Sequence, residues 1–252
     1  MEEFLEAIAQ AGLRLAEMEA SEGAAGNISL SIEGPLNPYQ VFAQKEEVEL
    51  PIEAPELVGS YVLATGSGCR LREIERDPVA QLGLLQIISP QRAFLYTHPR
   101  RRFRRLTSEL NSHLAIHRER PRGLAVIHAQ PLHLTYLSHI PAYRDASALN
   151  ARLLRWQPET IVHLPEGLGV LPFLLPGSQE LQEATVRLLR SHRAVLWSKH
   201  GILAVGQIAE AVDLVEYLET AARYEYLDLT AGQRAEGLSP EELRRIAERF
   251  GL

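Results

Sequence analysis

The sequence predicts an α/β fold formed by a single domain that spans residues 1–252. Two apolar patterns support this class. Helical stretches repeat apolar residues at steps of three and four, and short apolar runs end in glycine, proline or polar residues, as strands do. No linker, repeat or low-complexity tract divides the chain, and a hydrophobic content of 46% supplies ample core for one domain.

The first half of the chain is expected to begin with a helix and continue with strands. Apolar residues recur at helical spacing from Glu2 to about Met18. The segment 37–58 is rich in proline and glutamate, and we interpret it as a surface excursion. The strands expected in this half are 28–32, which enters a hairpin turning at Gly34-Pro35, 61–64, and the antiparallel pair 84–88 and 93–96.

The second half is expected to alternate helices with short buried strands. Thr107 or Ser108 can cap a helix whose first turn contains Glu109. The apolar run 124–131 predicts a strand that ends at Pro131, because proline lacks the N–H that a ladder needs. Further elements expected are a strand at 160–164, a helix from 176–178 to about Arg190, a strand at 194–197, a helix from Ile208 and a final helix opened by the capping box at Ser239-Pro240-Glu241-Glu242.

Composition excludes several classes of function. A formal net charge of −6 argues against a nucleic-acid surface, which needs a clustered positive field. The single cysteine, Cys69, excludes an intramolecular disulfide framework and a zinc ribbon, and it fits a reducing cytoplasm. Glu2 and Glu3 stand where a secretory signal carries positive charge, and no apolar run reaches the roughly 18 residues of a membrane span. We therefore expect a cytoplasmic protein with neither nucleic acid nor membrane as partner.

Polar residues with metal-binding side chains gather at the ends of two apolar strands. His128 and Gln130 end the strand at 124–131, His200 follows the strand at 194–197, and Glu109 lies upstream. Two imidazoles with a nearby carboxylate suit a divalent cation, and zinc favours imidazole nitrogen. The two histidines are far apart in the sequence, so two unrelated core histidines would give the same pattern.

Two other histidines follow Glu109 at helical spacing. Glu109, His113 and His117 are expected on one helix face at four-residue steps. That spacing resembles a helical metal site, but a lone helix face of this kind is more often a solvated surface or a ladder of salt bridges. We interpret His113 and His117 as structural.

Two loops rich in glycine and hydroxyl residues could contact an anion. They are 23–27 and 65–68, where glycine lets backbone N–H groups approach a ligand closely. Neither has the spacing of a P-loop or of a dinucleotide fingerprint, so nucleotide cofactors are not expected. The basic run 100–105 is usually a solvated loop, with steering of an anionic substrate as the alternative.

Taken in order, these motifs resemble the class II aldolase/adducin family over nearly the whole chain. The resemblance implies a three-layer α/β/α fold with a central, mainly antiparallel sheet, and a homotetramer with sites at subunit interfaces. The motifs that carry it are Gly26-Asn27, Thr65-Gly66-Ser67-Gly68, Thr107-Ser108-Glu109-Leu110, His128-x-Gln130 and His200-Gly201, with further likeness at 77–83, 167–172 and 196–201.

The resemblance also implies an activity and a role for each matching residue. The activity is metal-dependent, reversible cleavage of a ketose 1-phosphate similar to L-rhamnulose 1-phosphate, through a metal-stabilised enediolate, to dihydroxyacetone phosphate and an aldehyde. Glu109 matches the catalytic base, and Glu159 matches an acid/base carboxylate supplied by a neighbouring subunit. The phosphate loops match at Gly26, Asn27, Thr65, Gly66, Ser67, Gly68, Thr107 and Ser108.

The implied metal site departs from the family at one position. His128 and His200 match two metal-binding histidines, whereas Gln130 stands where the family has a third. Zinc is the expected cofactor, but the amide oxygen of Gln130 also suits Mn²⁺ or Co²⁺. Two other functions stay open: a pentulose-phosphate 4-epimerase with similar metal chemistry, and a non-catalytic sugar-phosphate-binding protein. Gln130 favours the latter, and retention of Glu109, His128 and His200 argues against it.

Overall fold

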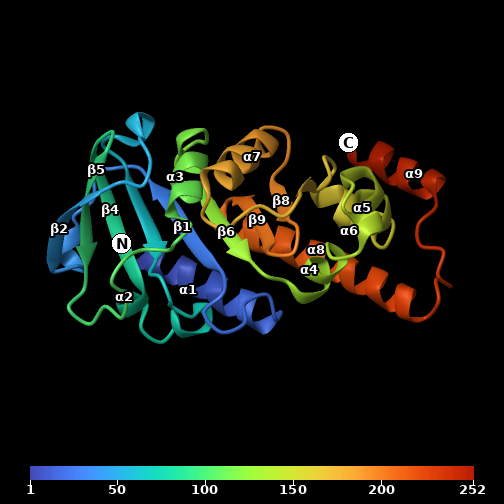
Figure 1. Cartoon of the computed structure of the whole chain (residues 1–252), viewed down its shortest axis with the longest axis horizontal. Coiled ribbons are helices and arrows are strands. Elements are labelled where there is room, and N and C mark those ends of the chain that lie inside the picture. Colours follow the sequence, from blue (N-terminus) through green and yellow to red (C-terminus); the bar gives the residue numbers. More distant parts are fainter.

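The computed structural model describes residues 1–252, and one nine-stranded sheet runs through its length (Figure 1). The strands are β1 (Asn27–Ile32), β2 (Gln44–Glu49), β3 (Tyr61–Thr65), β4 (Leu82–Ser89), β5 (Arg92–Thr97), β6 (Ala125–Ala129), β7 (Gly169–Leu171), β8 (Ala194–Trp197) and β9 (Gly201–Gly206). Their order is β2-β5-β4-β3-β1-β6-β9-β8-β7. Only β7 and β8 pair in parallel, so the predicted mainly antiparallel sheet is confirmed.

Helices cover both faces of the sheet, which confirms the predicted three layers (Figure 1). One face carries α1 (Glu2–Glu17), α4 (Leu132–Leu137) and α8 (Ile208–Thr230), and the other carries α3 (Leu110–Arg118) and α7 (Gln179–Leu189). The remaining helices are α2 (Pro78–Gln81), α5 (Ala146–Leu153), α6 (Pro158–His163) and α9 (Pro240–Phe250), with short 3₁₀ turns at Pro38–Gln40, Pro55–Leu57, Leu71–Glu73 and Pro141–Tyr143. None of these helices combines the length and apolar character needed to cross a bilayer.

Side chains of β1 alternate between the two faces of the sheet, apolar residues on one face and polar residues on the other. Ile28 and Leu30 enter the large apolar core with residues of α1 and α8. Asn27 and Ser29 point to the opposite face, where α3 lies, because successive side chains of a strand alternate. A buried polar layer therefore lies between β1 and α3, and it positions the site described below.

Three predictions about the chain path are wrong. Residues 160–164 are not a strand, because Pro158 occupies the first helical position and starts α6. No hairpin turns at Gly34-Pro35, since β1 pairs with β3 and β6 instead. The segment 37–58 is more than a surface excursion, because it contains the edge strand β2, which pairs with β5.

The other predicted elements are confirmed, with shifted ends. The helix expected at Glu2 to about Met18 is α1, and the capping box at Ser239 opens α9 as predicted. The helix after the hydroxyl loop begins at Leu110, so Glu109 precedes the first turn as its N-cap residue. The organisation as one domain over 1–252 stays a prediction.

Candidate metal centre and active site

Strand pairing brings the two predicted histidine ligands together. His128 lies near the end of β6, and β6 pairs with β9 so that Ala129 is opposite Ile202. His200 occupies the tight turn between β8 and β9, one residue before β9 begins. Gly201 allows the close approach, since a Cβ at that position would collide with the carbonyl oxygen of Ala129.

Glu109 completes a compact cluster with the two histidines. Its Oε2 lies 3.7 Å from His128 Nε2, and its Oε1 lies 3.5 Å from His200 Nε2. One ligand atom from each of the three residues falls within 4.8 Å of the others. Glu109 and His128 are buried, whereas His200 is partly open. The convergence expected from the motifs is therefore present.

Contacts with the surrounding protein orient both imidazoles. His128 Nδ1 donates a hydrogen bond to the carbonyl of Ile202 at 3.0 Å, which leaves the lone pair of Nε2 directed at Glu109. Burial, followed by the nearby imidazole of His128, lowers the pKa of His200 to about 4. Trp197 stacks on both rings, with centroids 4.9 Å from His128 and 5.2 Å from His200.

This donor set fits a divalent cation. Two imidazole nitrogens and a carboxylate oxygen are typical ligands of a catalytic zinc. Gln130 lies close to His128. A Cβ added at Gly201 would be 3.0 Å from the Cγ of Gln130 and 3.0 Å from the Cε1 of His128, so both side chains border the same point. A metal-binding role for the amide of Gln130 stays a prediction.

The loops 65–68 and 105–108, here called the two hydroxyl loops, lie side by side next to Glu109. Gly66 bridges to Leu106, Ser67 N–H donates to the carbonyl of Arg105, and Thr107 N–H donates to the carbonyl of Thr65. The hydroxyl of Thr107 in turn accepts a hydrogen bond from Glu109 N–H at 3.2 Å. Ser67 and Ser108 keep exposed surface, and the exposed Gly68 has a φ of +80°.

Three other residues predicted to bind phosphate, Gly26, Asn27 and Thr65, make packing contacts or hydrogen bonds within the protein. Gly26 has a φ of +80° and packs against the carbonyl of His128, where no side chain would fit. Thr65 Oγ1 accepts a hydrogen bond from Ile28 N–H. Asn27 is buried, and both ends of its amide are occupied: Nδ2 donates to Glu109 Oε2 at 2.9 Å, and Oδ1 is 2.5 Å from His113 Nε2. The side chain of Asn27 therefore serves the carboxylate.

Glu159 does not join the cluster. It is exposed in the first turn of α6. Its carboxylate lies near Tyr217 on α8, where burial, the charge of Asp213 and then the charge of Glu159 raise the pKa of the tyrosine. A role for Glu159 in the reaction thus requires a second subunit.

The predicted structural role of His113 and His117 agrees with their contacts. Both rings are buried on α3 and bond to the hydroxyl of Ser29 on β1, at 2.6 and 2.8 Å. Neither belongs to the Glu109, His128 and His200 group. Sequence reasoning missed Ser29, although its place two residues after Asn27 on one strand face was a signal.

Comparison with known proteins places the chain in a family. Residues 6–226 match the family described as Class II Aldolase and Adducin N-terminal domain. The chain belongs to this family. It is 32% identical to the rhamnulose-1-phosphate aldolase of Yersinia pestis (strain Pestoides F) over 238 residues, which cover 90% of this chain and 86% of the relative. It is 30% identical to the rhamnulose-1-phosphate aldolase of Listeria monocytogenes, over 81% of this chain and 77% of the relative.

A solved structure of a related aldolase has a similar fold. The crystal structure of a sugar-phosphate aldolase from Thermotoga maritima has a TM-score of 0.79 and 30% identity, covering 93% of this chain and 98% of that chain. The predicted resemblance to the class II aldolase/adducin family, and to rhamnulose-1-phosphate aldolases in particular, is confirmed.

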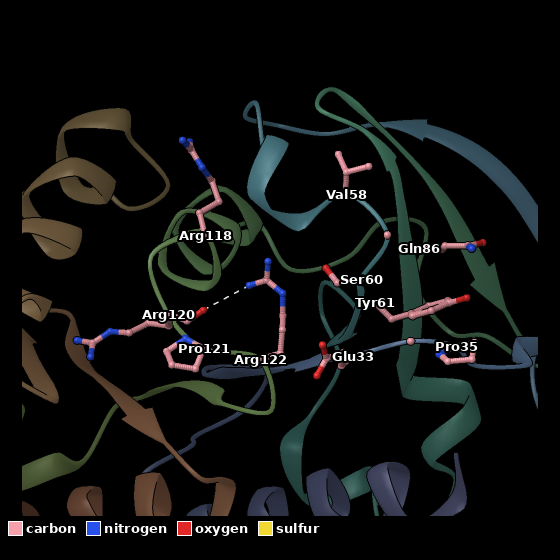
Figure 2. Close-up of a pocket in the computed structure, with 12 residues that line it drawn as sticks. Glu33, Pro35, Val58, Ser60, Tyr61, Gln86, Arg118, Arg120, Pro121 and Arg122 are labelled. Atoms are coloured by element: carbon pink, nitrogen blue, oxygen red, sulfur yellow. Dashed lines mark hydrogen bonds between the residues drawn. The ribbon is translucent and has the colours of Figure 1, made fainter.

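Neither of two hollows in this class II aldolase fold contains the cluster. One, of about 940 Å³, is lined by Arg105, Thr107, Ser108 and residues of α7. The other, of about 770 Å³, lies at the opposite end of β1 and is lined by Glu33, Ser60 and three arginines (Figure 2).

The arginines of the second hollow are already paired within the protein. Arg118 binds the carboxylate of Glu56, with Nε at 2.8 Å from Oε2. Arg122 donates to the carbonyls of His117 and Arg120, the latter contact being drawn in Figure 2. The predicted site residues all lie elsewhere, so this hollow is not the candidate active site.

Proposed function

We propose that this protein is a metal-dependent aldolase that reversibly cleaves a ketose 1-phosphate similar to L-rhamnulose 1-phosphate. The products are dihydroxyacetone phosphate and an aldehyde. The convergence of Glu109, His128 and His200 within 4.8 Å carries the proposal. The rhamnulose-1-phosphate aldolases among its relatives support the substrate class.

Glu109 is the proposed base, and the geometry favours one of its oxygens. Oε2 accepts a hydrogen bond from Asn27 Nδ2 at 2.9 Å, whereas no side-chain hydrogen bond reaches Oε1. Oε1 therefore holds and returns the proton that is exchanged at the dihydroxyacetone phosphate carbon. The site is buried around Glu109, which limits competition from water.

His128 and His200, with Glu109 and Gln130 beside them, would hold the divalent cation, zinc in the first instance. When bound, the cation supplies positive charge where the enediolate develops negative charge. His128 is held for this task by its hydrogen bond to the Ile202 carbonyl and by the indole of Trp197.

The phosphate is proposed to bind where the two hydroxyl loops meet. Ser67 and Ser108 offer hydroxyl groups that keep solvent-accessible surface, and α3 begins two residues after Ser108. The N-terminal end of a helix favours an anion through its free N–H groups and dipole. Arg105 adds positive charge next to these loops, and the structure contains no ion pair of its side chain.

The proton on the aldehyde oxygen is assigned to Glu159 of a neighbouring subunit. Glu159 is exposed on α6 and lies away from the cluster of its own chain. A residue that reaches into the active site of a neighbouring subunit must be exposed in this way. We accordingly propose a homotetramer with active sites between subunits.

Metal content and cleavage of rhamnulose 1-phosphate, measured with added zinc, cobalt or manganese, test this function. Cleavage is expected with at least one metal, and Glu109→Ala should lower kcat by about 10²–10⁴-fold. Glu119→Ala is the control, since Glu119 is exposed just after α3 and pairs with Arg190. Bound metal without turnover of any ketose phosphate would favour the binding protein, and interconversion of pentulose phosphates would favour the epimerase.

A further inference from the structure

The polar layer between β1 and α3 forms one continuous hydrogen-bonded chain that ends at Glu109. Asn27 Nδ2 is 2.9 Å from Glu109 Oε2, and His113 Nε2 is 2.5 Å from Asn27 Oδ1. Ser29 Oγ then lies 2.6 Å from His113 Nδ1 and 2.8 Å from His117 Nε2. All five side chains are buried.

We propose that His113, Ser29 and His117 are positioning residues that act through Asn27 to fix the carboxylate of Glu109. The proposal rests on the proposed function for its effect on turnover. His128 and His200 line the other side of the same carboxylate, at 3.7 and 3.5 Å. The chain thus sets the angle at which Glu109 faces both imidazoles.

The direction of every hydrogen bond follows from the carboxylate at one end. Asn27 donates to Glu109 Oε2 with Nδ2, so its Oδ1 must accept on the other side. His113 therefore carries its proton on Nε2, and its bare Nδ1 accepts from the hydroxyl of Ser29. The oxygen of Ser29 is then free to accept from His117 Nε2.

His117, at the far end of the hydrogen-bonded chain, agrees with this direction of the hydrogen bonds. His117 Nδ1 is buried and has no hydrogen-bond partner, as expected for an unprotonated nitrogen. Burial lowers the pKa of His117 to about 3 and that of His113 well below its usual value, so both rings are neutral as the chain requires. Arg122 donates to the His117 carbonyl at 2.9 Å, which anchors the end of α3.

The hydrogen-bonded chain orients the carboxylate of Glu109 but does not carry a proton to or from it. An amide separates His113 from Glu109, and an amide does not exchange a proton with a carboxylate as an imidazole does. The hydrogen bond from Asn27 lowers the basicity of Oε2, so Oε1 is the more basic oxygen of Glu109. Loss of the chain should therefore slow the chemical step and leave the binding of the phosphate unchanged.

Ser29→Ala tests the middle of the chain, with Ser112→Ala as the matched control. Both hydroxyls are buried, but that of Ser112, on α3, has no partner and lies outside the chain. Ser29→Ala should lower kcat by about 10–100-fold, the usual effect of losing a supporting hydrogen bond, with KM changed less than about 2-fold. Equal kcat values for the two variants, or a loss that appears only in KM, would overturn the proposal.

Substitution at His113 tests the coupling to Asn27. His113→Gln can still donate to Asn27 and accept from Ser29, so it should keep more of kcat than His113→Leu. If His113 acts through Asn27, the double variant Asn27→Ala/His113→Leu should turn over no more slowly than Asn27→Ala alone. Additive losses in the double variant, or no rescue by Gln, would overturn the proposal.

A measurement independent of turnover separates this inference from the proposed function. Long-range ¹H–¹⁵N NMR of the histidine rings should show His113 and His117 as neutral Nε2–H tautomers at pH 7. An Nδ1–H tautomer of either ring would refute the chain even in an active enzyme. Absence of aldolase turnover in the wild type would refute the function, and the tautomers would still decide the chain.

Discussion

Acid should destabilise this protein through His117, and His117→Gln isolates that effect. The ring is fully buried between α3 and β1, and burial followed by the charge of Arg122 lowers its pKa from 6.5 to about 3. Glutamine at this position removes the titrating group but retains an N–H that can donate to Ser29.

The magnitude follows from the difference between the two pKa values. Below pH 6.5 the unfolded chain binds a proton at His117 that the folded protein does not, so the free energy of unfolding falls as pH falls. Each pH unit of difference is worth about 1.4 kcal/mol. Between pH 6.5 and 4.5, where folded His117 is still neutral, the loss attributable to His117 is about 2 kcal/mol.

Urea unfolding at fixed protein concentration measures this loss. The wild type should lose about 2 kcal/mol more than His117→Gln between pH 6.5 and 4.5, because other groups contribute nearly equally to both proteins. Ser112→Ala, a buried change on the same helix without a titrating group, should keep the wild-type dependence. The same pH dependence in wild type and His117→Gln would show that His117 is protonated in the folded protein, and the reasoning would fail.

Three further outcomes are expected at the metal cluster and its surroundings. Gln130→His should raise zinc affinity in a competition titration with a chelator, and unchanged or weaker binding would mean that Gln130 does not face the cation. Gly201→Ala should lower the thermal midpoint and the bound metal together, because its Cβ meets a carbonyl of the adjacent strand; a fully stable, metal-loaded variant would contradict the close approach. Mixing and refolding inactive Glu109→Ala and Glu159→Gln should restore activity in about a quarter of sites if each site draws on two subunits of a ring, whereas no recovery would place both residues in one chain.

Much of the fold could be predicted because apolar spacing reports burial. The periodicity of α1 and the capping box of α9 were sufficient to predict those helices. The edge strand β2 was missed because its residues, QKEEVE, are almost all exposed and carry no apolar alternation. Residues 160–163 are rich in β-branched side chains, but Pro158 favours a helix start, and the segment packs against α8 and α9 as helix α6.

The site was less predictable from spacing, because its members meet only through the sheet. Nothing local joins His128 to His200; the pairing of β6 with β9 does so, and only the ordered motifs of the family indicated it. The link from Asn27 to Glu109 was also not visible, since it depends on α3 crossing the polar face of β1. The resemblance assigned Asn27 to a phosphate loop, whereas its side chain is committed to Glu109 and His113.

The central claim is that His128 and His200 bind one cation beside Glu109. Anomalous diffraction at the zinc edge from crystals of the zinc-loaded protein tests it most directly. We predict a single strong peak within about 2.0–2.2 Å of Nε2 of both imidazoles, the usual length of a zinc–nitrogen bond. A peak bound to only one of these histidines, or no peak between them at saturating zinc, would contradict the account.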